Sequence, residues 1–454
     1  MSEGKLIRQL GVFSATAIVV ANMVGTGIFT TTGFLAGDLG SAPLVVAIWF
    51  VGAALAFAGA LCYSELGINF PRSGGEYVYL TEAWGPSWGF LTGWVSFFAG
   101  FSAPIAAAAL AVSEYLSHFN PALSTQSDAS NVVLGPLTLR LGPGQWLACI
   151  LVALFTALNV FGMRPAARAQ NFLTATKVVV ILAFVALGFT LGHGDWAHFS
   201  QPAVRTSQNS VAAQFVLSLV WVFFGYSGWN AATYVAEELR DPDRTIPRSL
   251  LAGTLLVALL YAGLNVAFIY ASPLESMKGV LGVGAHAASA LFGPSVAGVF
   301  SALMAFCLLS TVNAMTMIGP RVYYAMASRG AFFPIAARVH PVWHTPWIAV
   351  LAQGACCCLM ILCGTFAGLV QYIGFSLWLF TLMAVAGLLR LRRRPGWKPL
   401  PAANFLFPLV PGLYIVTSAW VLLFMIGLRP VQSAYGLVTI ALGATLHRWV
   451  LRGR

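Results

Sequence analysis

The sequence has 454 residues, of which 59% are hydrophobic and only 8% are charged. Soluble domains carry roughly 25% charged residues, so this composition excludes a water-soluble globular protein. The formal net charge of +11 is compatible with nucleic-acid binding, but the basic residues gather in short segments between long apolar runs, a pattern that reports membrane topology. We expect an all-α integral membrane protein in contact with the lipid bilayer, without a nucleic-acid partner.

Apolar runs of membrane-spanning length recur along the whole chain, each close to the roughly 20 residues that a spanning helix needs. The longest polar connections, residues 117–142 and 192–210, are too short to form a soluble domain. The runs predict twelve spanning helices, centred near residues 22, 55, 101, 152, 181, 222, 260, 310, 355, 379, 416 and 440.

Basic residues give the orientation of these helices. If residue 1 is cytoplasmic and twelve helices follow, most lysines and arginines, including Lys5, Arg452 and Arg454, fall on the cytoplasmic side. The outer segments then hold only Arg140, Arg205, Lys278 and Arg429. We expect a multi-pass protein of the plasma (cell inner) membrane with both termini in the cytoplasm.

The first apolar run is interrupted by Gly25, Thr26 and Gly27. A helix break at membrane depth is tolerated only where the freed backbone groups meet protein, water or a ligand. We expect the inner half to end near Met23 and the outer half to begin near Ile28. Free N–H groups at the second half suit an anion, and free carbonyls at the first half suit a cation. The alternative is a packing notch at which helices approach closely.

A second interruption lies in the sixth run, from Phe224 to Asn230. Glycine-interrupted segments at corresponding positions of two halves indicate a transporter built from inverted repeats. We expect repeat one at about 9–192 and repeat two at about 211–394, within a transport core of residues 1–398. Residues 399–454 would then form two additional helices.

The two breaks together suggest the ligand. Phe224, Gly225 and Ser227 add open backbone groups at the depth of the first break. A small molecule that carries both a carboxylate and an ammonium group would satisfy the two opposed helix ends. This is the outline of an α-amino acid.

Lys177 lies about one third of the way into the fifth run. An ionisable residue inside the membrane is a functional hypothesis by default. Buried between helices, it would carry a proton or act as a fixed positive charge in place of a bound cation. The alternative is that its long side chain extends to the inner interface.

The other ionisable residues are expected outside the site. Glu65, Glu76, Glu237 and Glu238 fall at the predicted inner membrane face, and the stretch 237–248 predicts ion pairs between helix ends that stabilise an inner gate. His340 and His344 have a metal-like spacing, but Pro341 and Pro346 predict a loop there. We expect neither a metal nor a cofactor.

At these residues the sequence resembles the amino acid–polyamine–organocation superfamily, most closely its L-type amino acid transporters and their bacterial relatives. The resemblance is carried by Val24-Gly-Thr-Gly-Ile-Phe29, by Tyr63-Ser-Glu-Leu-Gly67 with Pro71-Arg-Ser-Gly-Gly-Glu-Tyr77, and by Gly228-Trp-Asn230 with Glu237-Glu-Leu-Arg-Asp-Pro242. It implies the LeuT-type fold, with five-plus-five inverted repeats, discontinuous helices 1 and 6, and two extra C-terminal helices.

The resemblance also implies roles for individual residues. The substrate carboxylate would meet backbone N–H groups of Gly25, Thr26 and Gly27, and the amino group would meet carbonyls of the two breaks. The residues implied are Met23, Phe224 as acceptor and gate, Gly225, Ser227, Asn230 as the support of the second break, Lys177 in place of a sodium ion, and Thr311 and Asn313 near it.

Two departures from the family pattern affect the pocket. Thr26 replaces a serine and Ser227 replaces a glycine, so both add bulk beside the ligand and favour smaller side chains. The segment 117–142 lacks the cysteine with which L-type members link to a single-span glycoprotein, so no disulfide-linked subunit is expected.

The sequence therefore predicts a sodium-independent amino acid transporter that works by alternating access, as an exchanger or with a proton, on small or neutral L-amino acids. One alternative keeps the fold but carries a polyamine or organic cation, which would need carboxylates in the site. Another is a channel or a membrane sensor without turnover. An enzyme is not expected, because the runs contain no nucleophile–base pair or metal-ligand set.

Overall fold

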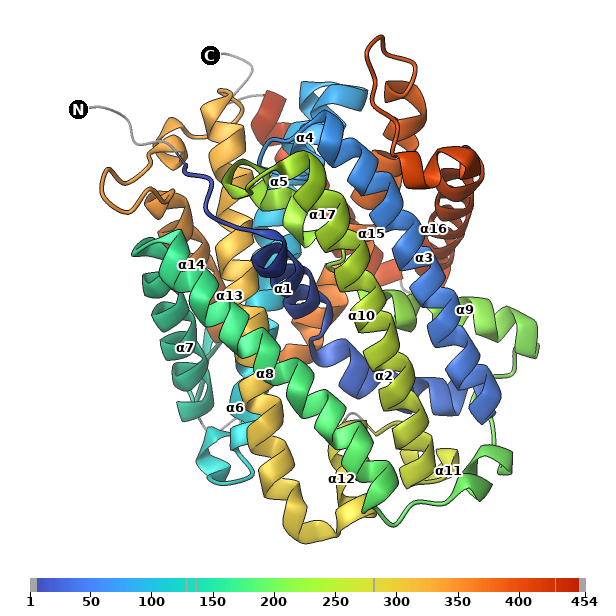
Figure 1. Cartoon of the computed structure of the whole chain (residues 1–454). Coiled ribbons are helices and arrows are strands. Elements are labelled where there is room, and N and C mark those ends of the chain that lie inside the picture. Colours follow the sequence, from blue (N-terminus) through green and yellow to red (C-terminus); the bar gives the residue numbers. More distant parts are fainter. Residues whose placement is uncertain (1–5, 127–129, 135–136, 281, 429, 449–454) are drawn as a thin grey trace.

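The computed structural model describes residues 6–126, 130–134, 137–280, 282–428 and 430–448. Lys5, Arg429, Arg452 and Arg454, used above for the orientation, lie outside these residues. The chain is a bundle of helices with one two-stranded antiparallel hairpin (Figure 1). Up to the second break its elements are α1 Val12–Met23, α2 Thr26–Leu39, α3 Ala42–Asn69, α4 Glu76–Trp84, α5 Pro86–Val95, the π-helix η1 Ser96–Ser102, α6 Ala103–Leu116, η2 Pro121–Leu123, β1 Asn131–Leu134, β2 Leu137–Arg140, α7 Pro143–Val160, α8 Met163–Thr190, η3 Trp196–Ser200 and α9 Val211–Tyr226.

The remaining elements begin beyond the second break. They are η4 Ala231–Glu238, α10 Pro242–Ala271, α11 Leu274–Met277, α12 Val283–Phe292, η5 Pro294–Val296, α13 Ala297–Ser328, η6 Pro334–Ala337, α14 Trp347–Cys363, α15 Phe366–Leu391, η7 Pro401–Leu406, α16 Leu409–Leu428 and α17 Pro430–Leu446. The hairpin β1–β2 and the short helix α12 are features that the sequence analysis does not predict.

A helix lies at each of the twelve predicted centres. Within the described residues, nine helical segments are long and apolar enough to cross a membrane, and the helices near residues 355, 379 and 440 contribute shorter apolar stretches. The protein is thus a multi-pass membrane protein. The number twelve and the inverted repeat stay predictions.

Helix starts follow local chemistry. Pro43, Pro86, Pro143 and Pro242 lie in the first turn of α3, α5, α7 and α10, where the missing N–H costs no helical hydrogen bond. Pro104, just after η1, cannot donate to the carbonyl four residues earlier, which accounts for the local widening to a π-helix.

The outer surface of the bundle is apolar, as a bilayer requires. On α8, Phe172, Val179, Leu182 and Leu187 are all exposed, although a soluble helix would bury such side chains. The polar side chains of α8 point the other way, since Gln170 and Lys177 are fully buried. Lipid on one side and the bundle on the other explain this division.

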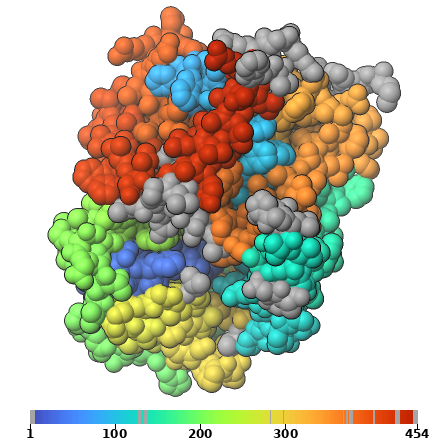
Figure 2. Space-filling model, turned by 180° about the vertical axis from the view of Figure 1, so that it is seen from behind, coloured from blue at the N-terminus to red at the C-terminus, as the bar shows by residue number. Residues whose placement is uncertain are grey.

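The broken helix lies at the centre of the bundle. α1 packs against α8, α10 and α13, whereas α2 packs against α9 and α12 (Figure 1). Seen from behind, α2 reaches the surface as a blue patch framed by the green segment that includes α9 and the yellow segment that includes α12 (Figure 2).

Both predicted interruptions are present, with shifted boundaries. α1 ends at Met23 as expected, but α2 already begins at Thr26, because extended Gly25 serves as its N-cap. In the sixth span the helix continues through Phe224 and Gly225 to Tyr226, so the break comprises residues 227–230. The expectation that Phe224 and Gly225 lie in the unwound segment is therefore wrong for their backbone conformation.

Gly228 explains why the second break falls there. Its φ of +100° is a conformation that residues with a side chain rarely adopt, and an added Cβ would lie 2.9 Å from the backbone of Asn22. A helix cannot pass through a residue in this conformation. Gly228 thus ends the sixth helix and lets it approach the first.

Candidate functional site

The two breaks line one cavity of about 330 Å³, at the small end of the roughly 300–1,000 Å³ range of ligand pockets. Most of its exposed lining is apolar. The lining combines residues of the breaks with side chains of α5, η1, α6, α13 and α15, and includes Met23, Gly25, Thr26, Gly27, Ser96, Phe101, Trp221, Phe224, Ser227, Asn230, Thr311, Phe380 and Thr381.

The start of α2 supplies hydrogen-bond donors to this cavity. Thr26 and Gly27 are the first residues of α2, so their N–H groups have no acceptor within the helix. The Gly25 N–H is less free than expected, because it donates to the Met23 carbonyl at 2.9 Å. The N–H groups of Thr26 and Gly27 at a helix N-terminus suit a carboxylate.

Lys177 is fully buried and does not extend to the interface. Its Nζ donates to the Val24 carbonyl at 2.5 Å and to Thr311 Oγ1 at 3.2 Å. Thr311 Oγ1 also lies 3.1 Å from the Ala21 carbonyl, to which it can donate. The ammonium group therefore ties α8 and α13 to the end of α1, where free carbonyls attract a cation.

Asn313 does not join this cluster, contrary to the expectation. Its amide donates to Gln170 Oε1 at 2.9 Å and to the Ala166 carbonyl at 3.2 Å, and it accepts from Asn159. Two residues apart on a helix, Thr311 and Asn313 point in different directions. Asn313 therefore joins α13 to α7 and α8 instead of facing the cavity.

Tyr261 of α10 links the two breaks. Its hydroxyl lies 2.6 Å from the Met23 carbonyl and 2.9 Å from the Gly225 carbonyl, and its single proton serves one of them at a time. The side chain is fully buried and packs edge-on against Trp49. The sequence analysis missed Tyr261, because one tyrosine among apolar residues of α10 carries no signal.

At the second break, the Phe224 carbonyl already accepts hydrogen bonds from Ser227. Ser227 Oγ donates to the Phe224 carbonyl at 2.8 Å, and the Ser227 N–H approaches the same carbonyl at 3.2 Å. A ligand ammonium group would share or replace these donors. The ring of Phe224 borders the cavity beside Gly27, where its Cδ1 lies 3.3 Å from the position of an added Cβ.

Asn230 lines the cavity but directs its amide toward Glu76, donating to Oε1 at 2.5 Å. Tyr63 donates to the same oxygen at 2.9 Å, and Tyr234 donates to Oε2. Glu76 itself lines the cavity and is only 4% exposed. The expectation that every acid lies outside the site is therefore wrong for Glu76, because its hydrogen bonds to Asn230 and Tyr234 hold it beside the second break, in the cavity wall.

Ion pairs are present at the end of the bundle that is predicted to be cytoplasmic, called the inner end below, but they include partners outside the stretch 237–248. Glu238 pairs with Arg321 of α13 at 2.8 Å, and both side chains are fully buried. The segment before α1 also pairs with the end of η4, since Leu10 and Leu239 form a parallel bridge. The inner ends of both broken helices are thus held together.

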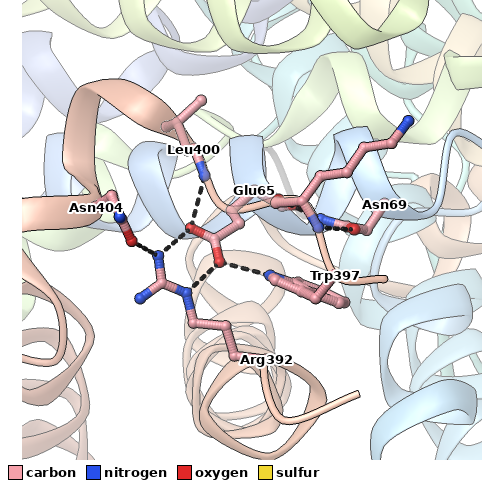
Figure 3. A network of polar contacts seen from close by, with 7 residues as sticks. Glu65, Asn69, Arg392, Trp397, Leu400 and Asn404 are labelled. Atoms are coloured by element: carbon pink, nitrogen blue, oxygen red, sulfur yellow. Dashed lines mark hydrogen bonds and ion pairs between the residues drawn. The ribbon is translucent and has the colours of Figure 1, made fainter. Parts of the chain in front are cut away.

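Glu65 forms a second inner-end network (Figure 3). Arg392 Nε and Trp397 Nε1 both donate to Glu65 Oε1 at 2.7 Å, and the Leu400 N–H donates to Oε2 at 3.1 Å. Asn404 accepts from the same arginine. This network fastens the segment after α15 to the end of α3.

One known protein family matches nearly the whole chain. The sequence profile of the amino acid permease family matches residues 10–446. The chain belongs to the amino acid permease family, within the amino acid–polyamine–organocation superfamily.

The relatives of this permease include characterised transporters. It is 31% identical to the large neutral amino acids transporter small subunit 2 of Oryctolagus cuniculus, over 97% of this chain and 80% of the relative. It is 29% identical to the Asc-type amino acid transporter 1 of Mus musculus, over 97% and 81%. With the serine/threonine exchanger SteT of Bacillus subtilis it shares 27% identity, over 92% and 91%.

Proposed function

We propose that this permease is a sodium-independent amino acid exchanger of the plasma membrane, which binds its substrate between the two helix breaks and works by alternating access. The observation that carries the proposal is the meeting of both breaks at one cavity. There the N–H groups of Thr26 and Gly27 face the space bordered by Phe224. An α-amino acid has the charges that these helix ends attract.

Independence from sodium is supported by Lys177. Its ammonium group contacts the Val24 carbonyl and Thr311 Oγ1, two oxygen atoms of the kind that would coordinate a cation. A sodium ion at the same oxygens would face an uncompensated like charge. Lys177 thus supplies the positive charge that sodium would bring.

A small or neutral side chain suits the cavity. The volume of about 330 Å³ is shared with the α-carboxylate and α-amino groups, and Thr26 and Ser227 occupy part of the lining. Exchange, a single-chain unit without a disulfide-linked subunit, and a neutral substrate are parts of the same proposal. The names of the relatives, which include large neutral amino acid and serine/threonine transporters, support this substrate class.

A polyamine is the weaker reading. Glu76 is a carboxylate in the cavity wall, but both of its oxygens already accept hydrogen bonds from the protein. Lys177, which is hydrogen-bonded to the cavity residue Thr311, adds a positive charge that would repel a dication. Stabilisation of the purified protein by a diamine, without stabilisation by any amino acid, would favour this reading.

The proposal is tested with purified protein in proteoliposomes. Labelled L-serine, L-alanine and L-leucine are offered to vesicles that are empty or preloaded with the unlabelled amino acid, in sodium and in choline buffer. Preloading accelerates uptake only in a carrier, so it excludes a channel or a sensor. Equal uptake in empty and preloaded vesicles, or uptake that requires sodium, contradicts the proposal.

A further inference from the structure

Three carboxylates are buried near the inner end of the bundle, and they differ in their partners. Glu238 pairs with Arg321, and Glu65 pairs with Arg392. Within the described residues, no lysine, arginine or histidine forms an ion pair with Glu76. Glu76 is also the carboxylate among these three that lines the cavity.

The donors around Glu76 are neutral, and they come from two parts of the molecule. Tyr63 belongs to α3, whereas Asn230 and Tyr234 belong to the second break and to η4. Glu76 itself begins α4, directly after the positive-φ residue Gly75. The carboxylate therefore fastens the inner half of the sixth span to the corner between α3 and α4.

In the part of the chain that the structure describes, no basic side chain pairs with the carboxylate of Glu76. The titratable groups that face it are tyrosines, which are neutral at physiological pH: Tyr63 on α3, Tyr79 on α4, Tyr234 on η4 and Tyr414 on α16. Arg329, which follows the end of α13, lies over the ring of Tyr77, the residue after Glu76. Hydrogen bonds and the N-terminus of α4 thus stabilise the charge without a basic partner.

We propose that Glu76 is a proton-binding latch of the inner gate, which holds η4 while it is a carboxylate and releases η4 when it takes up a proton from the cavity. This inference rests on the proposed exchange function and adds a pH-dependent step to it. The proton binds a carboxylate oxygen when the donors leave and returns to the solvent when they come back.

The direction of the pH effect follows from the hydrogen-bond donors to Glu76. When η4 moves away, Glu76 loses Asn230 and Tyr234 and keeps Tyr63. A buried carboxylate with fewer donors binds a proton more tightly, so acid favours the released state. Glu76 lies between the spanning segments Ala42–Asn69 and Pro86–Leu116, and burial raises the pKa of its carboxyl despite the hydrogen bonds that lower it.

The first test is the pH profile of L-serine exchange in proteoliposomes, with equal pH inside and outside, from about pH 5 to about pH 8.5. Wild-type exchange is expected to rise as the pH falls, by up to about tenfold per pH unit, the limit for one proton. Glu76→Gln cannot titrate, so its exchange is expected to lose this dependence. A wild-type profile in Glu76→Gln, or no exchange at any pH in a folded variant, overturns the latch.

Two further variants separate a latch from a structural role. Tyr234→Phe removes one donor to the carboxylate and is expected to move the midpoint of the profile upward by about one pH unit. Glu65→Gln makes the same substitution at a buried carboxylate that has an arginine partner, and it is expected to keep the midpoint. An unchanged midpoint in Tyr234→Phe contradicts the proposal.

A measurement that does not involve transport tests the latch independently of the exchange function. Amide hydrogen exchange of η4 in the purified full-length protein, corrected for intrinsic rates, is expected to increase on acidification in wild type and to be high at every pH in Glu76→Gln. Equal protection in both proteins overturns the latch. If preloading accelerates the uptake of none of the three amino acids, the result contradicts the proposed function and not the latch.

Discussion

The backbone of Gly225 occupies the space that a side chain at Gly27 would need. A Cβ added to Gly27 would lie 2.8 Å from the Gly225 Cα, closer than real Cβ contacts allow. Gly25, two residues earlier, has room, since the nearest atom to an added Cβ is a Thr311 methyl at 3.9 Å. The close approach of the two broken helices therefore requires a glycine at Gly27 but not at Gly25.

Gly27→Ala is expected to reduce exchange by about 5- to 140-fold, because it forces the two broken helices apart by overpacking, which costs about 1–3 kcal/mol. Gly25→Ala serves as the matched control in the same segment and is expected to keep most activity. Initial rates of L-serine counterflow measure both. Equal loss in the two variants would show that the Gly27–Gly225 contact is not what matters.

Lys177→Ala is expected to abolish exchange or to change its pH dependence. The substitution removes a charged hydrogen bond to Val24, and such bonds contribute about 1.5–3 kcal/mol, or about 10- to 100-fold in an equilibrium. Thr311→Val removes the neighbouring hydroxyl without removing the charge and is expected to have a smaller effect. Wild-type rates with an unchanged pH profile in Lys177→Ala would rule out the role of Lys177.

Tyr261→Phe removes the hydroxyl that lies between the Met23 and Gly225 carbonyls, while it keeps the ring packed against Trp49. A buried hydrogen bond contributes about 0.5–1.5 kcal/mol, so we expect a loss of about 2- to 10-fold in exchange with little loss of thermal stability. Counterflow and a melting curve on the same preparation check this. A large drop in stability with unchanged exchange would assign Tyr261 to the fold alone.

Phe224→Ala is expected to cripple exchange and leave folding intact. The ring borders the cavity beside Gly27, so its removal leaves the bound substrate uncovered. Phe215→Ala is the control on the same helix, because Phe215 packs against the core and is not among the residues that line the cavity. Normal turnover in Phe224→Ala would count against its role as a gate.

Arg321→Ala is expected to lower thermal stability strongly, because it leaves Glu238 buried without its partner, a change that costs about 3–5 kcal/mol. Arg394→Ala breaks the half-exposed pair with Glu82 and is expected to cost about 0–1 kcal/mol. Melting temperatures of the purified variants compare the two. Similar shifts for both would contradict the assignment of Arg321 and Glu238 to a buried inner lock.

The sequence predicted the helices and both breaks because hydropathy and glycine placement are local signals. Apolar runs set the helix positions, and the glycines of each interruption set where regular structure ends. The break in the sixth span was predicted about one turn too early, at Phe224 and Gly225. The end of this helix depends on the contact between Gly228 and Asn22, which are far apart in the chain.

Residues whose role depends on contacts with other helices could not be predicted from local sequence signals. Glu76 and Tyr261 are recognised only by what they touch, and those partners come from other helices. The prediction for Asn313 was wrong for the same reason, because the direction of its side chain depends on how α13 is rotated against α7 and α8. Lys177 was noticed from the sequence because a lysine inside a spanning helix is costly wherever it points, and the structure shows it buried, whereas its role stays a prediction.

Counterflow in sodium-free buffer tests the central claim most directly. Purified protein is reconstituted, preloaded with unlabelled L-serine, L-alanine or L-leucine, and supplied with the labelled form in choline buffer. We predict that preloading accelerates uptake of at least one of these amino acids and that sodium leaves the rate unchanged. Uptake that ignores preloading, or that appears only with sodium, would contradict the assignment of this chain as a sodium-independent amino acid exchanger.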